Sequence, residues 1–286
     1  MGGGDHLRVL TAVLHSVNRH PHPFSGLRPE KAKGKERGGS AGPLVAPPAN
    51  VNEAAEEGLT VRLRTIRSFG SGRGRVTRGQ QRAYQHDFPR YAVPFSARPI
   101  EPKACFGRDA PLVLEIGFGM GETTTLIAAA HPELNFLAAE VFAAGIGSLA
   151  MRLRRENLTN VRIVEHDAVE VVRDMLFPQS LAAAHIFFPD PWPKARHHKR
   201  RLIAPAFVET LADRLRPGGF VHCATDWQHY AEQMLEVLSQ QSKLRNLHPG
   251  FAPRPVNPLC ERPATKFHTR GARLGHPVWD LVFERV

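Results

Sequence analysis

The chain has 286 residues, 42% of them hydrophobic, which is enough to form the core of one large domain. Its formal net charge of +11 at pH 7 favours a polyanionic partner, because cationic side chains that neutralise phosphates release counterions. The three cysteines lack CxxC spacing and no apolar run approaches the roughly 20 residues of a membrane span, so we expect a cytoplasmic protein without a metal site or a membrane segment.

The first part of the chain differs in composition from the rest. Residues 1–58 are rich in Pro, Gly, Ala and charge, and a segment with so little to bury is expected to be a disordered extension. Residues 59–100 read as a basic, glycine-punctuated arm that ends in a short helix. The arm carries Arg62, Arg64, Arg67, Arg73, Arg75 and Arg78.

Residues 101–286 form the third predicted segment, in which strand and helix patterns alternate. Strands are predicted over 112–119, 135–142, 161–168, 183–190, 220–227 and 278–286. Helices are predicted over 121–132, 143–157, 168–176, 204–219 and 229–241. Alternation of this kind indicates parallel strands joined by crossover helices, and hence a doubly wound, Rossmann-like α/β fold with a mostly parallel sheet.

The first predicted strand runs into a glycine loop. Gly117, Gly119 and Gly121 follow the acid Glu115 in the stretch LEIGFGMG. A dinucleotide site has the spacing GxGxxG and holds a pyrophosphate, which the neighbouring acid would repel. The GxGxG spacing with a preceding acid instead suits a cationic ligand with an amino-acid tail, such as S-adenosylmethionine.

Acids also end the next two predicted strands. Glu140 stands where a carboxylate can accept both hydroxyls of a ribose, and Asp167 where one can accept the amino group of adenine. Either acid alone could be a solvated loop residue. Together with the glycine loop they favour one nucleoside site at the carboxyl edge of the sheet.

The stretch FFPDPWPKARHHKRR, residues 187–201, follows the fourth predicted strand. Two prolines restrict the backbone around Asp190, and Trp192 offers a flat face for stacking. A carboxylate there can accept hydrogen bonds from the N1–H and 2-amino groups of guanine. The seven basic or histidine residues that follow would hold phosphates; a structural turn beside solvated surface charge is the alternative. They are Lys194, Arg196, His197, His198, Lys199, Arg200 and Arg201.

These stretches, together with ATDW and TKFHTRG further on, resemble the bacterial tRNA (guanine-N7-)-methyltransferases over about residues 62–286. The resemblance implies a class I S-adenosylmethionine-dependent methyltransferase fold. It also implies methylation of guanosine 46 in the variable loop of tRNA, by an enzyme that is a monomer or a homodimer.

The resemblance also implies roles for matching residues. Glu115, Glu140, Asp167 and Asp190 would bind the cofactor, and Asp190 would also be the active-site residue. The implied tRNA contacts are Lys194, Asp226, Thr265, Lys266, Phe267 and His268. His268 stands where the family has Glu, and because a histidine cannot act as a negatively charged acceptor, this contact is left open.

Three other functions remain as alternatives. An adenine amino-group methyltransferase would share the DPW pattern loosely, but not the basic run or the TKF stretch. A tRNA-binding protein that has lost catalysis is suggested only by His268. A nicotinamide oxidoreductase is disfavoured by the loop spacing.

Overall fold

The computed structural model describes residues 67–70, 76–253, 262–263 and 277–286. All of them belong to one compact unit, Thr65–Val286. The extension predicted over residues 1–58 lies outside the described residues.

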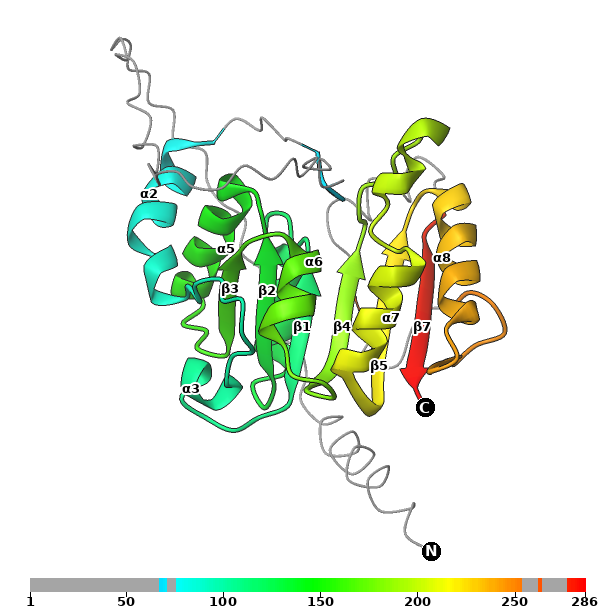
Figure 1. Cartoon of the computed structure of the whole chain (residues 1–286). Coiled ribbons are helices and arrows are strands. Elements are labelled where there is room, and N and C mark those ends of the chain that lie inside the picture. The colour runs from blue at the N-terminus through cyan, green and yellow to red at the C-terminus, as the bar shows by residue number, and fades with distance from the viewer. Residues whose placement is uncertain (1–66, 71–75, 254–261, 264–276) are drawn as a thin grey trace, which may run out of the picture. The chain divides into compact units, whose positions relative to one another are not determined.

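Seven strands form one sheet in the order β3-β2-β1-β4-β5-β7-β6 (Figure 1). Their bounds are β1 Leu112–Ile116, β2 Asn135–Glu140, β3 Val161–Glu165, β4 Leu181–Phe187, β5 Leu215–Thr225, β6 Leu244–Asn246 and β7 Trp279–Arg285. Neighbours from β3 to β5 pair in parallel, whereas β7 is antiparallel to both β5 and β6. The predicted Rossmann-like α/β fold is therefore confirmed, and the strand order reverses between β1 and β4, where such sheets bind ligands.

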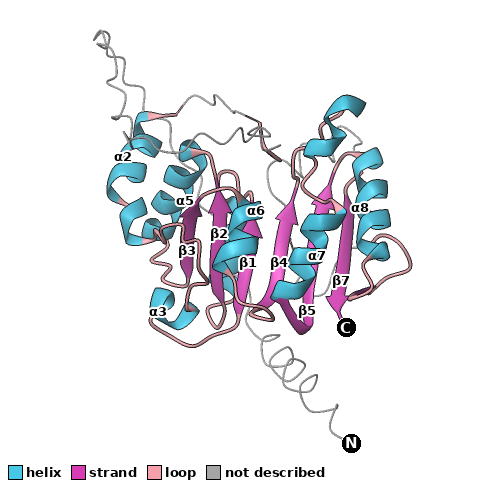
Figure 2. Cartoon of the chain, viewed as in Figure 1, coloured by secondary structure: helices cyan, strands magenta, loops and turns pink. Residues whose placement is uncertain are grey.

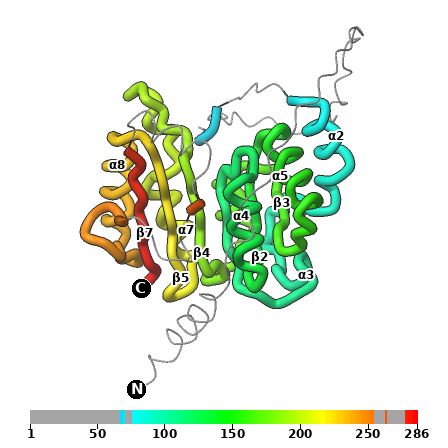
Figure 3. The backbone as a smooth tube through the Cα atoms, turned by 180° about the vertical axis from the view of Figure 1, so that it is seen from behind, coloured from blue at the N-terminus to red at the C-terminus, as the bar shows by residue number. Residues whose placement is uncertain are grey.

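Helices cover both faces of this sheet. Figure 2 shows α6 and α7 in front of it, and Figure 3, seen from behind, shows α4 and α5 on the other face. The main helices are α2 Arg78–His86, α3 Pro102–Phe106, α4 Glu122–Ala130, α5 Ala143–Arg155, α7 Pro205–Arg214 and α8 Gln228–Gln240. The short α6, Ala168–Glu170, continues into a π-helical turn over Val171–Met175, and a 3-10 helix spans Ala195–Arg200.

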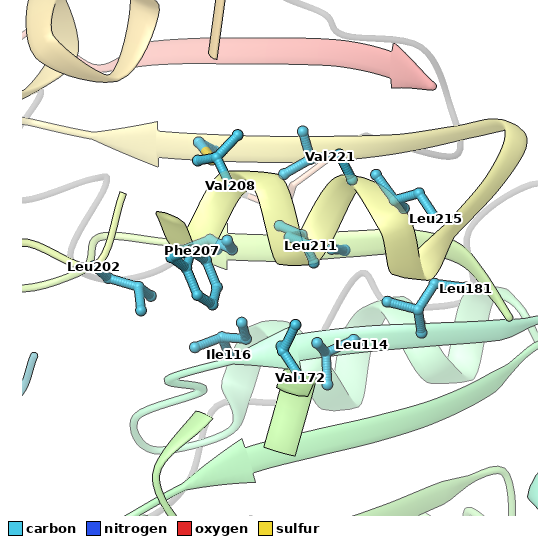
Figure 4. Close-up of a cluster of buried hydrophobic side chains, with 14 of the residues drawn as sticks. Leu114, Ile116, Val172, Leu181, Leu202, Phe207, Val208, Leu211, Leu215 and Val221 are labelled. Carbon is cyan, nitrogen blue, oxygen red and sulfur yellow. The ribbon is translucent and has the colours of Figure 1, made fainter. Parts of the chain in front are cut away.

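The hydrophobic core lies on both faces because side chains alternate along each strand. In β1, Leu114 and Ile116 pack in the cluster that includes α7 and α8, whereas Val113 packs in the cluster that includes α4 and α5. Figure 4 shows Phe207 and Leu211 of α7 beside Leu114 and Ile116. With both faces covered, β1 and β2 are buried along their whole length, which explains why most of their residues are apolar.

Helix α2 belongs to the predicted basic arm and packs on the folded unit. Thr77 caps it, since its hydroxyl accepts from the Gln80 amide at 3.2 Å while the Gln80 side chain accepts from the Thr77 amide at 2.9 Å. The helix lies beside α5 (Figure 1), where a side chain at Gly147 would clash with the Gln80 carbonyl oxygen. The absence of a side chain at Gly147 thus lets the two helices approach closely.

Some element boundaries differ from the sequence expectation. The helix predicted over 204–219 ends at Arg214, because Leu215 already pairs with Leu181 as the start of β5. Gly218 and Gly219 therefore lie inside a strand region and do not close the helix. Neither α3 nor β6 was predicted, since each is a single short turn or strand with too few residues to show a period.

Candidate active site

Two adjoining cavities open at the carboxyl edge of the sheet. The first, of about 260 Å³, is lined by the ends of β1 and β2, by Gly117 and Gly119, and by the loop over 188–190. The second, of about 370 Å³, is lined by the end of β3 and by the residues that follow it. Phe69, Val141 and His166 line both cavities, so the two cavities adjoin at these residues.

The glycine loop has a backbone that other residues adopt with difficulty. Gly117, Gly119 and Gly121 have φ values of 72°, 54° and 71°, all in the left-handed region. A Cβ at Gly121 would also lie 2.7 Å from the Leu149 side chain, and one at Gly145 of α5 would clash with the Gly119 carbonyl oxygen. The loop thus packs closely against α5, and Gly117 and Gly119 are exposed to the first cavity.

Glu140 holds this loop from the end of β2. Its carboxylate accepts hydrogen bonds from the amides of Gly119 at 3.1 Å, Val141 at 2.7 Å and Phe142 at 3.3 Å. Burial raises the pKa of Glu140, while these three amides act in the opposite direction. Glu140 therefore lines the first cavity and also fixes the main chain of the glycine loop and of the two residues that follow β2.

Glu115 lies inside β1 and is buried, so it does not line either cavity. Burial raises its pKa to about 7, the Thr124 hydroxyl lowers it, and the charge of Glu140 raises it further. Its Oε2 has no hydrogen-bond partner among the residues that the structure describes. Glu115, which was predicted to bind the cofactor directly, is one residue before Ile116 in the chain, and it is Ile116 that lines the first cavity.

Asp167 lines the second cavity and caps α6, since its carboxylate accepts a hydrogen bond from the Val169 amide at 3.0 Å.

Two residues near this cavity were not predicted from the sequence. His166 stacks on Phe95 with ring centroids 3.7 Å apart. The hydroxyl of Tyr84 in α2 donates to the Glu165 carboxylate at 2.5 Å. Burial, together with this hydrogen bond, raises the pKa of Tyr84 to about 12. Tyr84 lies 81 positions before its partner, so no local sequence signal could reveal the pair.

The loop after β4 places Asp190 at the rim of the first cavity. Phe188 and Trp192, two positions before and after Asp190, have φ values of 53° and 45°, which is unusual for residues with side chains. The Phe188 amide donates to the Ala224 carbonyl at 2.7 Å, and Arg201 Nε donates to the Pro191 carbonyl at 2.8 Å. The loop shape is thus imposed from both ends, in addition to the restriction by its prolines.

The basic run that follows Asp190 is divided between surface and interior. Lys194, Arg196 and Lys199 are exposed, as phosphate contacts must be. Arg201 is only 3% exposed and also donates to Nδ1 of His229 at 3.0 Å, so its guanidinium serves the fold. Arg200 covers the Trp192 ring at 3.9 Å from its centroid, on the flat face that the sequence offered for base stacking.

The remaining predicted substrate residues have varied positions. Asp226 comes directly after β5, whereas Lys194 lies in the loop that follows β4, and both side chains are exposed. Thr265, Lys266, Phe267 and His268 lie outside the described residues.

The described part of the chain shows neither a metal cluster nor a membrane-spanning helix. It contains no group of three or more His, Cys, Asp or Glu side chains arranged to hold a metal ion. No helix in it is long and apolar enough to cross a membrane.

Comparisons with known proteins show the family of this chain. A family model described as "Putative methyltransferase" matches residues 109–281. The tRNA (guanine-N(7)-)-methyltransferase of Bordetella pertussis is 59% identical over 220 residues, which are 77% of this chain and 85% of that protein. Proteins of the same name from Paraburkholderia xenovorans and Nitrosospira multiformis are 54% and 53% identical, over 83% and 78% of this chain and 89% and 95% of their own lengths. This chain belongs to the tRNA (guanine-N(7)-)-methyltransferase family.

Proposed function

We propose that this protein transfers a methyl group from S-adenosylmethionine to N7 of guanine in tRNA. The observation that carries the proposal is the position of Asp190, which lines the same cavity as Glu140 and the glycine loop. A carboxylate that can recognise a base thereby stands beside residues suited to an adenosyl cofactor.

S-adenosylmethionine fits the residues present. The two adjoining cavities, of about 260 and 370 Å³, fall together in the range of roughly 300–1,000 Å³ that small-molecule sites occupy. In this proposal Glu140 accepts the ribose hydroxyls and Asp167 accepts the adenine amino group. Gly117 and Gly119 leave the main chain open to the amino-acid part. When bound, the cofactor supplies a methyl group on a positively charged sulfur.

Asp190 has two tasks in the proposed reaction. Its carboxylate accepts from the N1–H and 2-amino groups of guanine, an edge that adenine does not present. It also stabilises the positive charge that develops on the ring as N7 is methylated. Because N7 carries a lone pair and no proton, no general base is required, and catalysis consists mainly of positioning and electrostatics.

A covalent nucleophile is disfavoured by the thiols that the structure describes. Burial raises the pKa of Cys223 to about 12, so it is not a thiolate at neutral pH. Burial also raises the pKa of Cys105, which lies in α3 rather than at either cavity. Methylation at a ring carbon through a cysteine adduct is thus poorly supported.

The finer assignments in this proposal rest on the family resemblance and on charge. The target is guanosine 46 in the variable loop, with Lys194, Asp226 and the segment 265–268 as tRNA contacts. The exposed Arg196 and Lys199 would add phosphate contacts. The enzyme would act in the cytoplasm as a monomer or a homodimer.

The test is a methyl-transfer assay with a labelled methyl donor and an unmodified tRNA transcript, followed by nucleoside mass spectrometry. We expect 7-methylguanosine from the transcript and none from a matched transcript in which guanosine 46 is replaced by adenosine. A methylated adenine would instead support the amino-group methyltransferase. Binding of tRNA without transfer would support a catalytically silent protein and would make His268→Glu the next variant.

A further inference from the structure

Residues 67–70 lie against the cavities although they are 120 positions before Asp190 in the chain. Ser68 and Phe69 line the first cavity, and Arg67 and Phe69 line the second. Figures 1 and 3 show these residues as a short coloured stretch near the carboxyl end of β4. We name residues 67–70 the strap.

The main chain of the strap is held by side chains of the segment 190–200. The Gly70 amide donates to Asp190 Oδ2 at 3.2 Å. The indole N–H of Trp192 donates to the Ser68 carbonyl at 3.0 Å.

Arg200 makes the two other contacts with the strap. Its Nε donates to the Arg67 carbonyl at 3.1 Å, and its second terminal nitrogen donates to the Phe69 carbonyl at 3.2 Å. The same guanidinium lies 3.9 Å from the centroid of the Trp192 ring. One planar group thus joins two strap carbonyls and an indole, whereas the neighbouring Lys199 is exposed.

We propose that the strap is the outer wall of the cofactor cavity and that Arg200 is the positioning residue that holds it there. In this role Arg200 is no phosphate contact, in contrast to what its place in the basic run suggests. The inference deepens the proposed function and rests on the same cofactor site.

A consequence distinguishes the two roles of Arg200. A phosphate contact affects only the RNA, so its loss leaves cofactor binding intact when RNA is absent. A residue that holds the cavity wall affects the cofactor itself, because a detached strap no longer shields the bound molecule. A lysine cannot substitute, since a single ammonium group does not reproduce the planar fork that reaches two carbonyls while stacking on a ring.

The test is isothermal titration of S-adenosylhomocysteine into the full-length protein without RNA. Arg200→Gln and Arg200→Lys should each raise the dissociation constant about tenfold, the equivalent of one charge-assisted hydrogen bond. Arg196→Gln is the matched control, because Arg196 is exposed and its Nε donates to the adjacent His197 at 3.4 Å, away from the strap. This control should keep the wild-type affinity for S-adenosylhomocysteine and weaken tRNA binding.

Trp192→Phe provides a second variant that does not depend on how Arg200 variants fold. It keeps an aromatic ring and removes the indole N–H that the Ser68 carbonyl accepts, so a smaller loss of affinity is expected. Hydrogen exchange of the peptide that spans the strap should show protection by S-adenosylhomocysteine in the wild type and less protection in Arg200→Gln.

Three outcomes separate this inference from the proposed function. Wild-type affinity in both Arg200 variants, with weaker tRNA binding, would overturn the strap and make Arg200 a phosphate contact. Unchanged exchange of the strap peptide upon S-adenosylhomocysteine binding would overturn it too. A wild-type protein that binds no S-adenosylhomocysteine at all would overturn the proposed function and the strap inference with it.

Discussion

Replacing Glu115 by glutamine should stabilise the free protein more at pH 8 than at pH 5. The carboxyl group is buried in β1, and its pKa stands at about 7 in the folded chain against an ordinary value of 4.5. Because the folded-state pKa is raised, ionisation favours the unfolded chain, and folding loses stability as the pH rises from 4.5 to 7. At 1.36 kcal/mol per pH unit, the full loss is about 3 kcal/mol, most of it between pH 5 and pH 8.

The assay is urea unfolding of wild type and Glu115→Gln at pH 5 and at pH 8, in the absence of cofactor. The free energy of unfolding of the variant, relative to wild type, should be greater at pH 8 than at pH 5 by about 2–3 kcal/mol. Glu209→Gln on α7 is the control, since its side chain is exposed and carries no burial penalty. An equal difference at both pH values would refute the argument, because it would mean that the Glu115 carboxylate stays solvated.

The other predictions concern the site itself. Asp190→Ala should lower kcat at least about 100-fold at an unchanged melting temperature, and substantial residual transfer would remove Asp190 from its assigned role. Lys194→Ala should raise the KM for tRNA more than the dissociation constant of S-adenosylhomocysteine, and the opposite order would show that the division of the site is mistaken. Gly145→Ala should abolish S-adenosylhomocysteine binding, as seen by titration, because the new methyl group collides with the Gly119 carbonyl oxygen; normal binding would mean that α5 can move away from the loop.

The sequence predicts the sheet and the edge at which the site lies, because both follow from local patterns. Alternating strands and helices imply parallel pairing, and parallel pairing brings the residues after β1, β2 and β4 to one edge. Glu140 and Asp190 could therefore be placed at one site from their positions alone. Their roles as cofactor and substrate residues stay predictions.

The same patterns do not reveal which side chains turn inward. Glu115 is one acid within the central strand β1, and only the assembled sheet with its covering helices shows that the side chain is buried. Arg200 and Arg201 are chemically identical neighbours in a basic run, yet one holds the strap and the other holds the Pro191 carbonyl. The hydrogen-bond acceptors of both arginines are main-chain carbonyl groups, which the sequence around the arginines does not indicate.

The left-handed backbone at Phe188 and Trp192 sets a limit on how far this enzyme can be stabilised by engineering. Each of these residues carries a cost of about 1–2 kcal/mol that glycine would avoid. Replacing either residue by glycine would relieve this backbone cost but would make the unfolded chain more flexible, so the net gain in stability is small. At position 192 that change would also remove the ring on which Arg200 stacks and the indole that binds the Ser68 carbonyl. Engineering at these two positions therefore exchanges backbone strain for lost contacts beside Asp190, so a thermal screen needs an activity assay in parallel.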